Sequence, residues 1–287
     1  MAKRKVTSTG QRRFGSHMSI AGGHYLAFER AQAVGCDCMQ VFVKNHRQWK
    51  NKPLADADIR AWEAARKATG IGPVIAHDSY LINLAAPDDA LYTRSIEAFV
   101  DELERCEALG IPGLVTHPGS HCGAGEDWGI TRIAAALDVI HKSTKGFKVR
   151  TLLEVTAGQG SAIGYRFEHL AAIMERVAAP ERLGVCLDTC HLFAAGYDVK
   201  SAEGYAATIA ALEEWIGVER VACIHTNDSK KPLGSRVDRH DHIGQGLMTT
   251  AAFANFINDP RFFGVPMILE TEKGEDEKGR DWDLINL

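Results

Sequence analysis

Acidic and imidazole side chains recur along this chain in groups that suit a cluster of metal ions. Three short segments carry them densely: Asp188-Thr189-Cys190-His191, His225-Thr226-Asn227-Asp228 and Asp238-Arg239-His240. Further residues of the same types stand at or just past the ends of apolar runs: His77, His117, Glu154 and Glu270. Imidazole nitrogen and carboxylate oxygen are ligands of borderline metals such as zinc. Because the set is larger than one ion needs, it predicts several metals in one site, and such sites commonly serve phosphoryl chemistry.

Short β-prone runs alternate with amphipathic helical stretches, and these elements would have to position the polar residues. The expected strands cover residues 14–18, 38–42, 74–76, 114–116, 150–154, 183–188, 221–225 and 266–270. Helices are expected between them, such as 55–69, 91–109, 131–142, 166–177 and 204–215. Strict alternation predicts a parallel sheet with helical crossovers. About eight repeats within 287 residues predict an α/β fold, a closed (β/α)8 TIM barrel.

The position of the polar residues within this pattern favours a closed barrel over an open sheet. The carboxyl ends of six expected strands carry His77, His117, Glu154, Asp188, His225 and Glu270. In a barrel these ends converge on one face, where active sites lie, whereas an open doubly wound sheet would spread them along an edge. We therefore expect the six residues to meet. His17, at the end of the first strand, is left open between metal ligation and a contact with a ligand or the substrate.

The chain is long enough for one large barrel or two ordinary domains. No Pro-, Gly- or Ser-rich linker divides it, so we expect a single TIM-barrel domain over residues 14–287. The first thirteen residues carry five cations: Lys3, Arg4, Lys5, Arg12 and Arg13. Because they include no apolar core, they are interpreted as a disordered basic extension and not as a secretory signal.

The composition is typical of a soluble globular protein, with 45% apolar and 24% charged residues. No apolar run is long enough to predict a membrane span. Seven scattered cysteines show no zinc-ribbon spacing, and we interpret them as reduced thiols of a cytoplasmic, monomeric protein. Cys186 is expected on the same strand face as Asp188, where it would line the barrel interior as a small apolar residue.

The formal net charge of −4 offers no global basic field that would attract nucleic acid. Divalent cations would neutralise the acidic ligands, and three of them would make the site itself cationic. The formal charge therefore does not exclude a polyanionic partner.

Each chemical signal also has an ordinary structural explanation. A single His after a strand is usually a hydrogen-bonded structural residue, and only its repetition at strand ends favours a metal centre. Asp238 and His240 are two residues apart, so they point the same way in an extended loop and could hold a separate ion with His191. The alternative for this segment is a surface loop with salt bridges to Arg236 and Arg239.

The segment from Lys44 to Lys52 follows the second expected strand and mixes cations with an aromatic ring, Trp49, as loops that contact nucleic acid do. Such a segment is more often a solvated loop, and its place at the catalytic end of the barrel is what favours DNA contact. Tyr80 adds a ring beside His77. The basic candidates for DNA contact are Lys44, Arg47, Lys230, Arg236 and Arg239. Serine-hydrolase, P-loop and dinucleotide motifs are absent from the sequence.

Taken together, these residues resemble the endonuclease IV family of apurinic/apyrimidinic (AP) endonucleases. The resemblance runs from Gly15-Ser16-His17-Met18-Ser19 to Leu269-Glu270-Thr271, which is nearly the whole chain. Its most specific stretches are His77-Asp78-Ser79-Tyr80-Leu81-Ile82-Asn83-Leu84, His117-Pro118-Gly119-Ser120, Gly184-Val185-Cys186-Leu187-Asp188-Thr189-Cys190-His191 and Gly234-Ser235-Arg236-Val237-Asp238-Arg239-His240. Val155 and Glu272 depart from the residues frequent in the family, and neither is a ligand position.

The resemblance implies a barrel with three zinc ions, replaceable in part by manganese or iron. The first ion would be held by His77, His117 and a bridging Glu154, the second by Glu154, Asp188, His225 and Glu270, and the third by His191, Asp238 and His240. The implied activity is DNA repair by a zinc-dependent deoxyribonuclease IV of the phage-T4-induced type. It would hydrolyse the phosphodiester 5′ to an abasic site in duplex DNA and leave a 3′-hydroxyl and a 5′-deoxyribose phosphate.

If the resemblance holds, Glu154 and Glu270 are the expected catalytic carboxylates. Glu154 would set the spacing of two ions, and Glu270 would orient the attacking hydroxide. Extrusion of the abasic sugar into a tight pocket would supply lesion specificity, because a missing base lowers the cost of flipping. Arg47 and Tyr80 are the candidates for filling the gap left in the base stack.

Two other functions compete with this one. A metal-dependent sugar isomerase or epimerase on a similar barrel would use Glu154, Asp188, His225 and Glu270, but it would not need the five remaining ligands. A non-catalytic protein that binds lesions would tolerate the loss of some ligands, and none is lost here.

Overall fold

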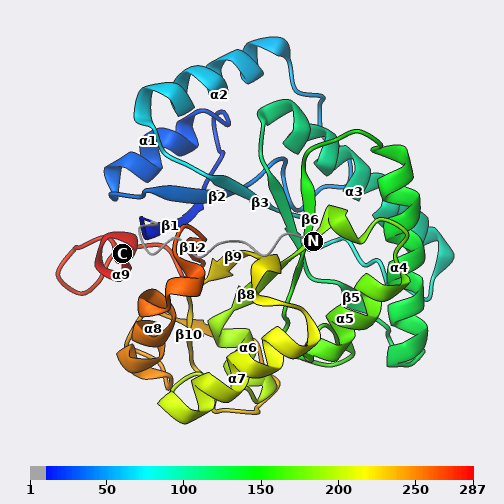
Figure 1. Ribbon diagram of the computed structural model, residues 1–287. Helices are drawn as coiled ribbons and strands as arrows, with labels where there is room; N and C mark the ends of the chain where they lie inside the picture. Colours follow the sequence, from blue (N-terminus) through cyan, green and yellow to red (C-terminus); the bar gives the residue numbers. More distant parts are fainter. Residues whose placement is uncertain (1–10) are drawn as a thin grey trace.

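The computed structural model describes residues 11–287, and within them eight parallel strands close into a barrel (Figure 1). The strands are β1 (Arg13–Met18), β2 (Cys38–Phe42), β3 (Val74–His77), β4 (Gly113–Thr116), β6 (Arg150–Glu154), β8 (Leu183–Asp188), β9 (Val221–His225) and β12 (Pro266–Leu269). Each strand pairs in parallel with the next, and β12 pairs with β1 to close the ring. The predicted (β/α)8 barrel is confirmed.

Helices cover the outside of the barrel (Figure 1). They are α1 (Leu26–Ala33), α2 (Asp56–Thr69), α3 (Asp89–Leu109), α4 (Glu126–Ser143), α5 (Phe167–Arg176), α6 (Thr189–Ala195), α7 (Ala202–Trp215), α8 (Thr249–Asn258) and α9 (Trp282–Asn286). The expected helices correspond to α2, α3, α4, α5 and α7. Only α4 begins clearly earlier than expected, because Glu126 and Asp127 in its first turn suit the positive end of the helix dipole.

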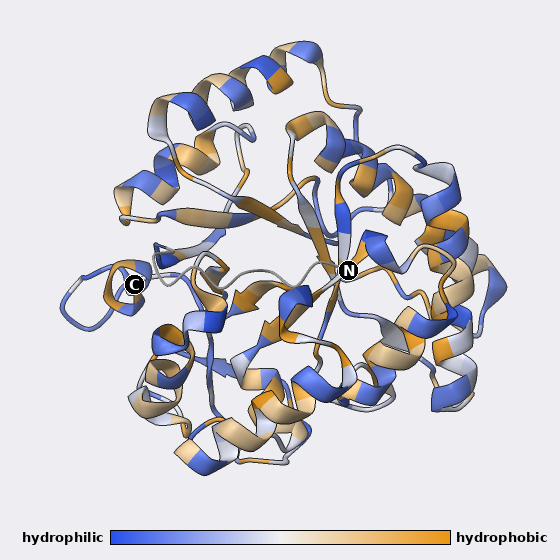
Figure 2. Ribbon diagram, viewed as in Figure 1, coloured by the Kyte–Doolittle hydropathy of each residue, from blue (hydrophilic) through white to orange (hydrophobic). Residues whose placement is uncertain are grey.

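Apolar side chains form two separate regions, because successive residues of a strand point alternately outward and inward. Met39 and Val41 of β2 belong to the large cluster beneath the helices, which also contains Phe28 and Trp62. Inside the barrel a second cluster contains Cys38, Ile75, Val115, Leu152, Cys186, Cys223 and Ile268. Cys186 thus lines the interior as expected. Figure 2 shows the apolar strands at the centre and hydrophilic stretches on the outer helices.

Two short antiparallel ribbons shape the loops between the barrel elements. One pairs β5 (Gly119–Ser120) with β7 (Ala162–Ile163), and the other pairs β10 (Asp228–Ser229) with β11 (His240–Asp241). The loop that follows β11 is held by Asp228, whose carboxylate accepts from the backbone N–H groups of Gly244, Gly246 and Met248 at 2.9, 3.2 and 3.0 Å. This anchoring fixes the ribbon that carries His240.

Residues 1–10 of the expected basic extension lie outside the described residues. Its last two residues contact the barrel. Nε of Arg12 donates to the Ile257 carbonyl at 2.8 Å, and Nη1 of Arg13 donates to the Gly72 carbonyl at 2.6 Å. Strand β1 begins at Arg13, one residue before the expected start, because Arg13 pairs with Pro266 of β12.

Candidate metal centre

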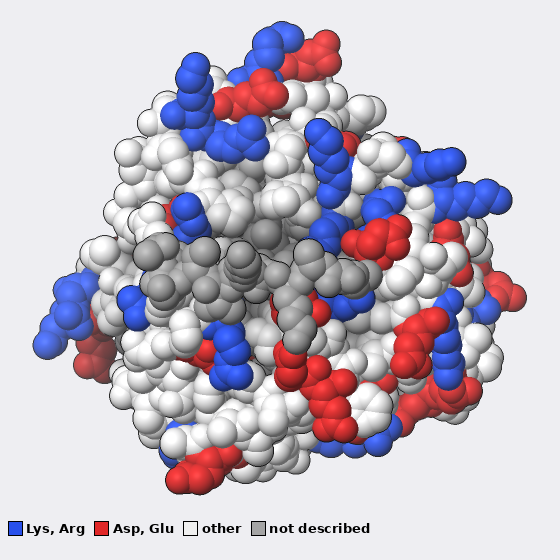
Figure 3. All heavy atoms as spheres, viewed as in Figure 1, with Lys and Arg blue, Asp and Glu red and all other residues white. Residues whose placement is uncertain are grey.

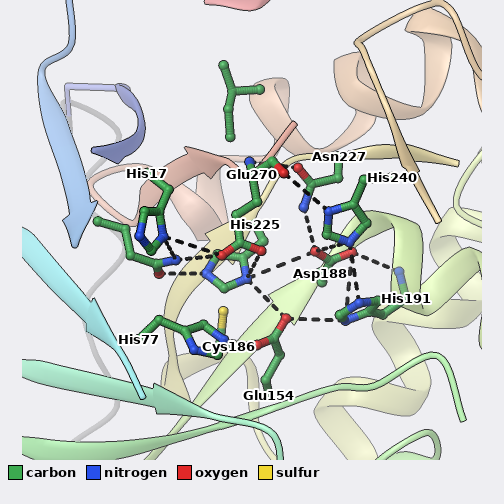
Figure 4. A network of polar contacts seen from close by, with 12 residues as sticks. His17, His77, Glu154, Cys186, Asp188, His191, His225, Asn227, His240 and Glu270 are labelled. Carbon is green, nitrogen blue, oxygen red and sulfur yellow. Dashed lines mark hydrogen bonds and ion pairs between the residues drawn. The ribbon is translucent and has the colours of Figure 1, made fainter. Parts of the chain in front are cut away.

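The carboxyl ends of six barrel strands bring six of the predicted ligands together, and Figure 4 shows His77, Glu154, Asp188, His225 and Glu270 among them. The last residues of β3, β6, β8 and β9 are His77, Glu154, Asp188 and His225, while His117 and Glu270 directly follow β4 and β12. Five groups of described residues have ligand atoms within 4.8 Å of one another, and two of them contain cysteines: Cys186, Cys223 and His225, and Asp188, Cys190 and His240. The other three are His77, His117 and Glu154; Glu154, Asp188, His225 and Glu270; and His191, Asp238 and His240. The structure thus brings together all nine predicted ligands, in the three sets implied by the resemblance.

Glu154 lies between the first two groups. Its Oε2 is 3.3 Å from Nε2 of His77 and 3.3 Å from Nε2 of His117, and its Oε1 is 3.0 Å from Nδ1 of His225. The Glu154 side chain is fully buried, whereas the His117 side chain is 40% exposed. The centre is therefore closed behind Glu154 and open to solvent beside His117.

Helix α6 begins directly after β8 and links the third group to the second. Asp188 caps this helix by accepting from the backbone N–H of His191 at 2.8 Å. The two carboxylate oxygens of Asp238 then lie 3.1 Å from Nε2 of His191 and 3.2 Å from Nε2 of His240. Because the Asp238 side chain is 37% exposed, this group also borders solvent.

Two of the buried imidazoles have one nitrogen bonded away from the centre and the other facing it. Nδ1 of His77 donates to the Asp78 carbonyl at 2.9 Å, and Nδ1 of His191 donates to the Val155 carbonyl at 2.9 Å. Because a carbonyl only accepts, Nδ1 carries a proton in both rings, and Nε2 has a lone pair for a cation when the ring is neutral. Histidines that ligate metals characteristically make such an outer hydrogen bond. The donor set and its orientation therefore fit zinc.

The carboxylates and imidazoles of the centre shift one another's proton affinities. Burial alone would lower the pKa of His77, but the hydrogen bond and charge of Glu154 raise this pKa to about 9. Burial also opposes protonation of His240, while the charge of Asp188 and the hydrogen bond to Asp238 raise its pKa to about 9. Burial would raise the pKa of Glu154, but the charge of His225, with that of His117, holds it well below the usual range. The negative charge of these carboxylates can therefore be compensated either by protons on the imidazoles or by bound cations.

Comparison with known proteins agrees with this geometry. A family model described as "Xylose isomerase-like TIM barrel" matches residues 28–284. A "Probable endonuclease 4" of Chloroflexus aggregans is 57% identical over 264 residues, which cover 92% of each chain. The crystal structure of endonuclease IV from Thermus thermophilus matches with a TM-score of 0.82 at 38% identity and covers 96% of both chains. The chain belongs to the endonuclease IV family.

The same barrel also occurs outside the endonuclease IV family. A 3-keto-D-glucoside 4-epimerase from E. coli matches with a TM-score of 0.67 at 14% identity and covers 96% of this chain and 98% of the epimerase. At this level of identity the likeness shows the fold alone.

Sequence analysis missed two buried amides that hold the ligands of this endonuclease IV barrel. Gln40 contacts His225 and Glu270 through its carboxamide. Asn227 donates to Oδ2 of Asp188 at 2.6 Å and accepts from the backbone N–H of Glu270 at 2.8 Å. One signal was available, because Gln40 is a polar residue within an apolar strand and Asn227 lies inside a ligand-rich segment.

His17 lies outside the candidate ligand groups. This residue belongs to none of the candidate metal groups found among the described residues. Its Nδ1 lies 3.0 Å from Nε2 of Gln40 and 3.9 Å from Oε1 of Glu270. His17 therefore stands behind a predicted ligand, one contact away from the centre.

Lys44, which was predicted to contact DNA, has its ammonium group turned into the protein. Nζ lies 3.1 Å from Asp101 and 3.3 Å from Glu102, donates to the Ala98 carbonyl at 3.4 Å, and the side chain is 1% exposed. The ammonium is thus buried between two carboxylate partners, and its contact with DNA remains a prediction. Burying a charge is tolerated where it is paired in this way.

The aromatic candidates for DNA contact differ in position. The Tyr80 side chain is 64% exposed, and its ring lies 5.5 Å from that of His77 and 5.9 Å from that of His46. Trp49 is half-buried with the Arg94 guanidinium 5.4 Å from its ring, so it is turned toward α3. The structure thus leaves Tyr80 available beside the centre and places Trp49 against a helix. Contact with DNA remains a prediction for both rings.

The four remaining basic candidates, Arg47, Lys230, Arg236 and Arg239, are exposed. Arg236 stacks with its guanidinium 3.9 Å from the Tyr165 ring and donates to the Gly158 carbonyl at 3.1 Å. Arg236 and Arg239 flank Asp238, so these two cations lie beside the third ligand group. Their contact with DNA remains a prediction.

Charge is mixed on the face of the molecule seen in Figure 3, where acidic and basic side chains alternate over its surface. Among residues 11–287, no helix combines the length and the apolar character needed to cross a bilayer.

Proposed function

We propose that this chain hydrolyses the phosphodiester 5′ to an abasic site in duplex DNA, with three zinc ions held by the nine ligands, and leaves a 3′-hydroxyl and a 5′-deoxyribose phosphate. The observation that carries the proposal is the convergence of three ligand groups at one barrel mouth, two of them sharing Glu154. Membership of the endonuclease IV family supports it. Manganese or iron could take the place of part of the zinc.

The protein's own contribution would be a fixed and partly dry arrangement of charges. Bound zinc would supply Lewis acidity, a lowered pKa of water and compensation of the phosphate charge. Glu154 would set the separation of two cations from its buried position. Glu270, 13% exposed at the rim of the centre, would orient the attacking water. The exposed sides of His117 and Asp238 leave room for a phosphodiester to approach.

Recognition of the lesion would depend on exposed residues beside the centre. Tyr80 packs against His77 and is open to solvent, which supports a role in which its ring enters a gap in the base stack. Arg47 is exposed in the loop that follows β2 and could assist. A normal nucleotide would have to unstack before it could enter, and that cost favours an abasic site. In this proposal the enzyme acts as a monomer in the cytoplasm, as the interpretation of its cysteines as reduced thiols suggests.

The competing function is a sugar isomerase or epimerase that uses the second ligand group alone. It would leave His77, His117, His191, Asp238 and His240 without a role, although they form two further compact groups. The metal content separates the two functions, because about three zinc ions per chain support the nuclease and about one supports the isomerase.

The deciding experiment uses a duplex with a single abasic site and a matched intact duplex. The protein as purified should cut only the first, at the phosphodiester 5′ to the lesion. Prolonged chelation should abolish cutting, and added zinc should restore it. Full cleavage by a preparation shown by elemental analysis to be free of metal would overturn the proposal.

A further inference from the structure

Gln40 is the only amide or charged side chain of β2, and it points into the barrel. Its neighbours Met39 and Val41 pack outward beneath the helices, while Cys38 faces the interior. Gln40 therefore stands on the inner face, one strand period above Cys38, and it is fully buried. A buried carboxamide is costly unless its donors and acceptor are satisfied, so its contacts define its role.

The carboxamide contacts two predicted ligands, Glu270 and His225, and also His17 (Figure 4). Nε2 donates to Oε1 of Glu270 at 2.5 Å and lies 3.0 Å from Nδ1 of His17, and Oε1 lies 2.8 Å from Nε2 of His225. The carboxylate of Glu270 can only accept at neutral pH, so the amide nitrogen must face it. The amide oxygen must then face His225.

This orientation determines which nitrogen of His225 is available to a cation. An amide oxygen only accepts, so Nε2 of His225 carries the proton and donates it to Gln40. Nδ1 then faces the carboxylates, 3.0 Å from Glu154 and 3.2 Å from Glu270, where a cation can take the place of its proton. The second amide proton is directed at His17, which holds the amide from the opposite side.

We propose that Gln40, backed by His17, is a positioning residue of the second ligand group. It presents His225 through Nδ1 and restrains Glu270 through one carboxylate oxygen, so that the other oxygen stays turned to the centre. The inference rests on the proposed function and specifies the orientation of two of its ligands. Gln40 touches neither a cation nor the substrate directly.

Two substitutions separate the two halves of this role. Gln40→Met keeps the length of the side chain and removes the hydrogen bonds to Glu270 and His225. Gln40→Glu keeps an oxygen for His225 but sets a second carboxylate against Glu270. Gln32→Met, the same change at an exposed position of α1, is the matched control, and Thr151→Val, on the outward face of β6, controls for the loss of a buried hydrogen bond to His141.

The first readout is nitrogen-15 NMR of the histidine rings, with and without cadmium-113. In the wild type the Nε2 proton of His225 should be protected from exchange, and Nδ1 should couple to cadmium. Gln40→Met should lose that protection and Gln40→Glu should retain it.

The second readout is competition with a chromophoric chelator, in which Gln40→Met should weaken the binding of one cation by about tenfold or more. The KM for abasic duplex should stay unchanged while kcat falls.

The outcomes distinguish this inference from the proposed function. An Nε2 proton of His225 that exchanges equally fast in the wild type and in Gln40→Met would overturn the inference, and so would unchanged affinity for every cation. The ring proton is readable without metal, so a wild-type protein that bound no cations would refute the proposed function and still test the contact. If Gln40→Met did not fold, the NMR spectrum of Gln40→Glu would test the contact with His225. The cation affinity of Gln40→Glu would test the contact with Glu270.

Discussion

The interior of the barrel contains two layers that differ in polarity although the same strands build both. The lower one, the apolar layer, is Cys38, Ile75, Val115, Leu152, Cys186, Cys223 and Ile268. The upper one, the polar layer, lies two residues further along each of these strands: Gln40, His77, His117, Glu154, Asp188, His225 and Glu270. One strand period therefore separates a dry core from a charged centre, because residues two apart share a face.

The contrast shows how the barrel tolerates two fully buried carboxylates, Glu154 and Asp188. The apolar layer closes the barrel from below, so the polar layer is reached only from the loop side. At β1 the lower position is Gly15, where an added Cβ would lie 1.9 Å from the Cys38 carbonyl oxygen, and the upper position is His17. The floor is thus closed by seven side chains and one close backbone contact. Charges above such a floor interact strongly, because water does not screen them from beneath.

The largest effect should follow from a change in the polar layer. Glu154→Gln should reduce cleavage of abasic DNA by more than ~100-fold and largely spare DNA binding, because the shared carboxylate sets the separation of two cations. Single-turnover cleavage and filter binding would measure the two properties. Wild-type turnover together with full metal content would show that Glu154 is not the bridge.

The matched change in the apolar layer is Leu152→Ala, two residues earlier on the same strand. Loss of a fully buried leucine should lower the free energy of unfolding by about 2–5 kcal/mol. Metal content and cleavage at temperatures far below the melting point should stay near wild type. Denaturant unfolding and elemental analysis would check this pair of results. A Leu152→Ala protein that lost metal but kept its stability would contradict the assignment of stability to the apolar layer and of metal binding to the polar layer.

A smaller effect is expected above the polar layer, where Tyr80 and Arg47 are exposed. Tyr80→Ala and Arg47→Ala should weaken binding of abasic duplex by about 1–3 kcal/mol, by analogy with stacking of bases on aromatic rings. Metal content should not change. Equal losses for abasic and intact duplex, measured by fluorescence anisotropy, would show that both side chains contact only the backbone.

The pH dependence of stability should be the mildest test and should differ with metal loading. In the metal-free protein the pKa values of His77 and His240 are about 9, above the ordinary value of about 6.5. The stabilisation that these two protonated imidazoles give to the folded protein is then complete below pH ~6.5 and is lost as the pH rises toward ~9. Metal binding strengthens over the same range because its ligands must lose protons. Calorimetry should show that the difference between the melting temperatures of the metal-loaded and the metal-free protein grows as the pH rises. A difference that stays the same at every pH would contradict this.

Much of this molecule was predictable from local patterns. The period of the strands, the helices between them and the ligand-type residues at strand ends are all local properties, and they led to the barrel and to one convergent site. The inward position of Gln40 could also have been derived, because it follows Cys38 by two residues as Asp188 follows Cys186. The buried position of the Lys44 ammonium could not have been derived from the sequence, since its partners Asp101 and Glu102 lie on a helix far along the chain.

The sequence by itself determined which residues face the barrel interior and at what height, because a strand alternates faces whatever surrounds it. Only the tertiary structure decided which atom of each residue faces the centre. Gln40 meets His225 and Glu270 across 185 and 230 residues of chain, and those contacts select the ligating nitrogen. The physical reason is that a side-chain proton is placed by its hydrogen-bond partner in space, and that partner comes from another strand.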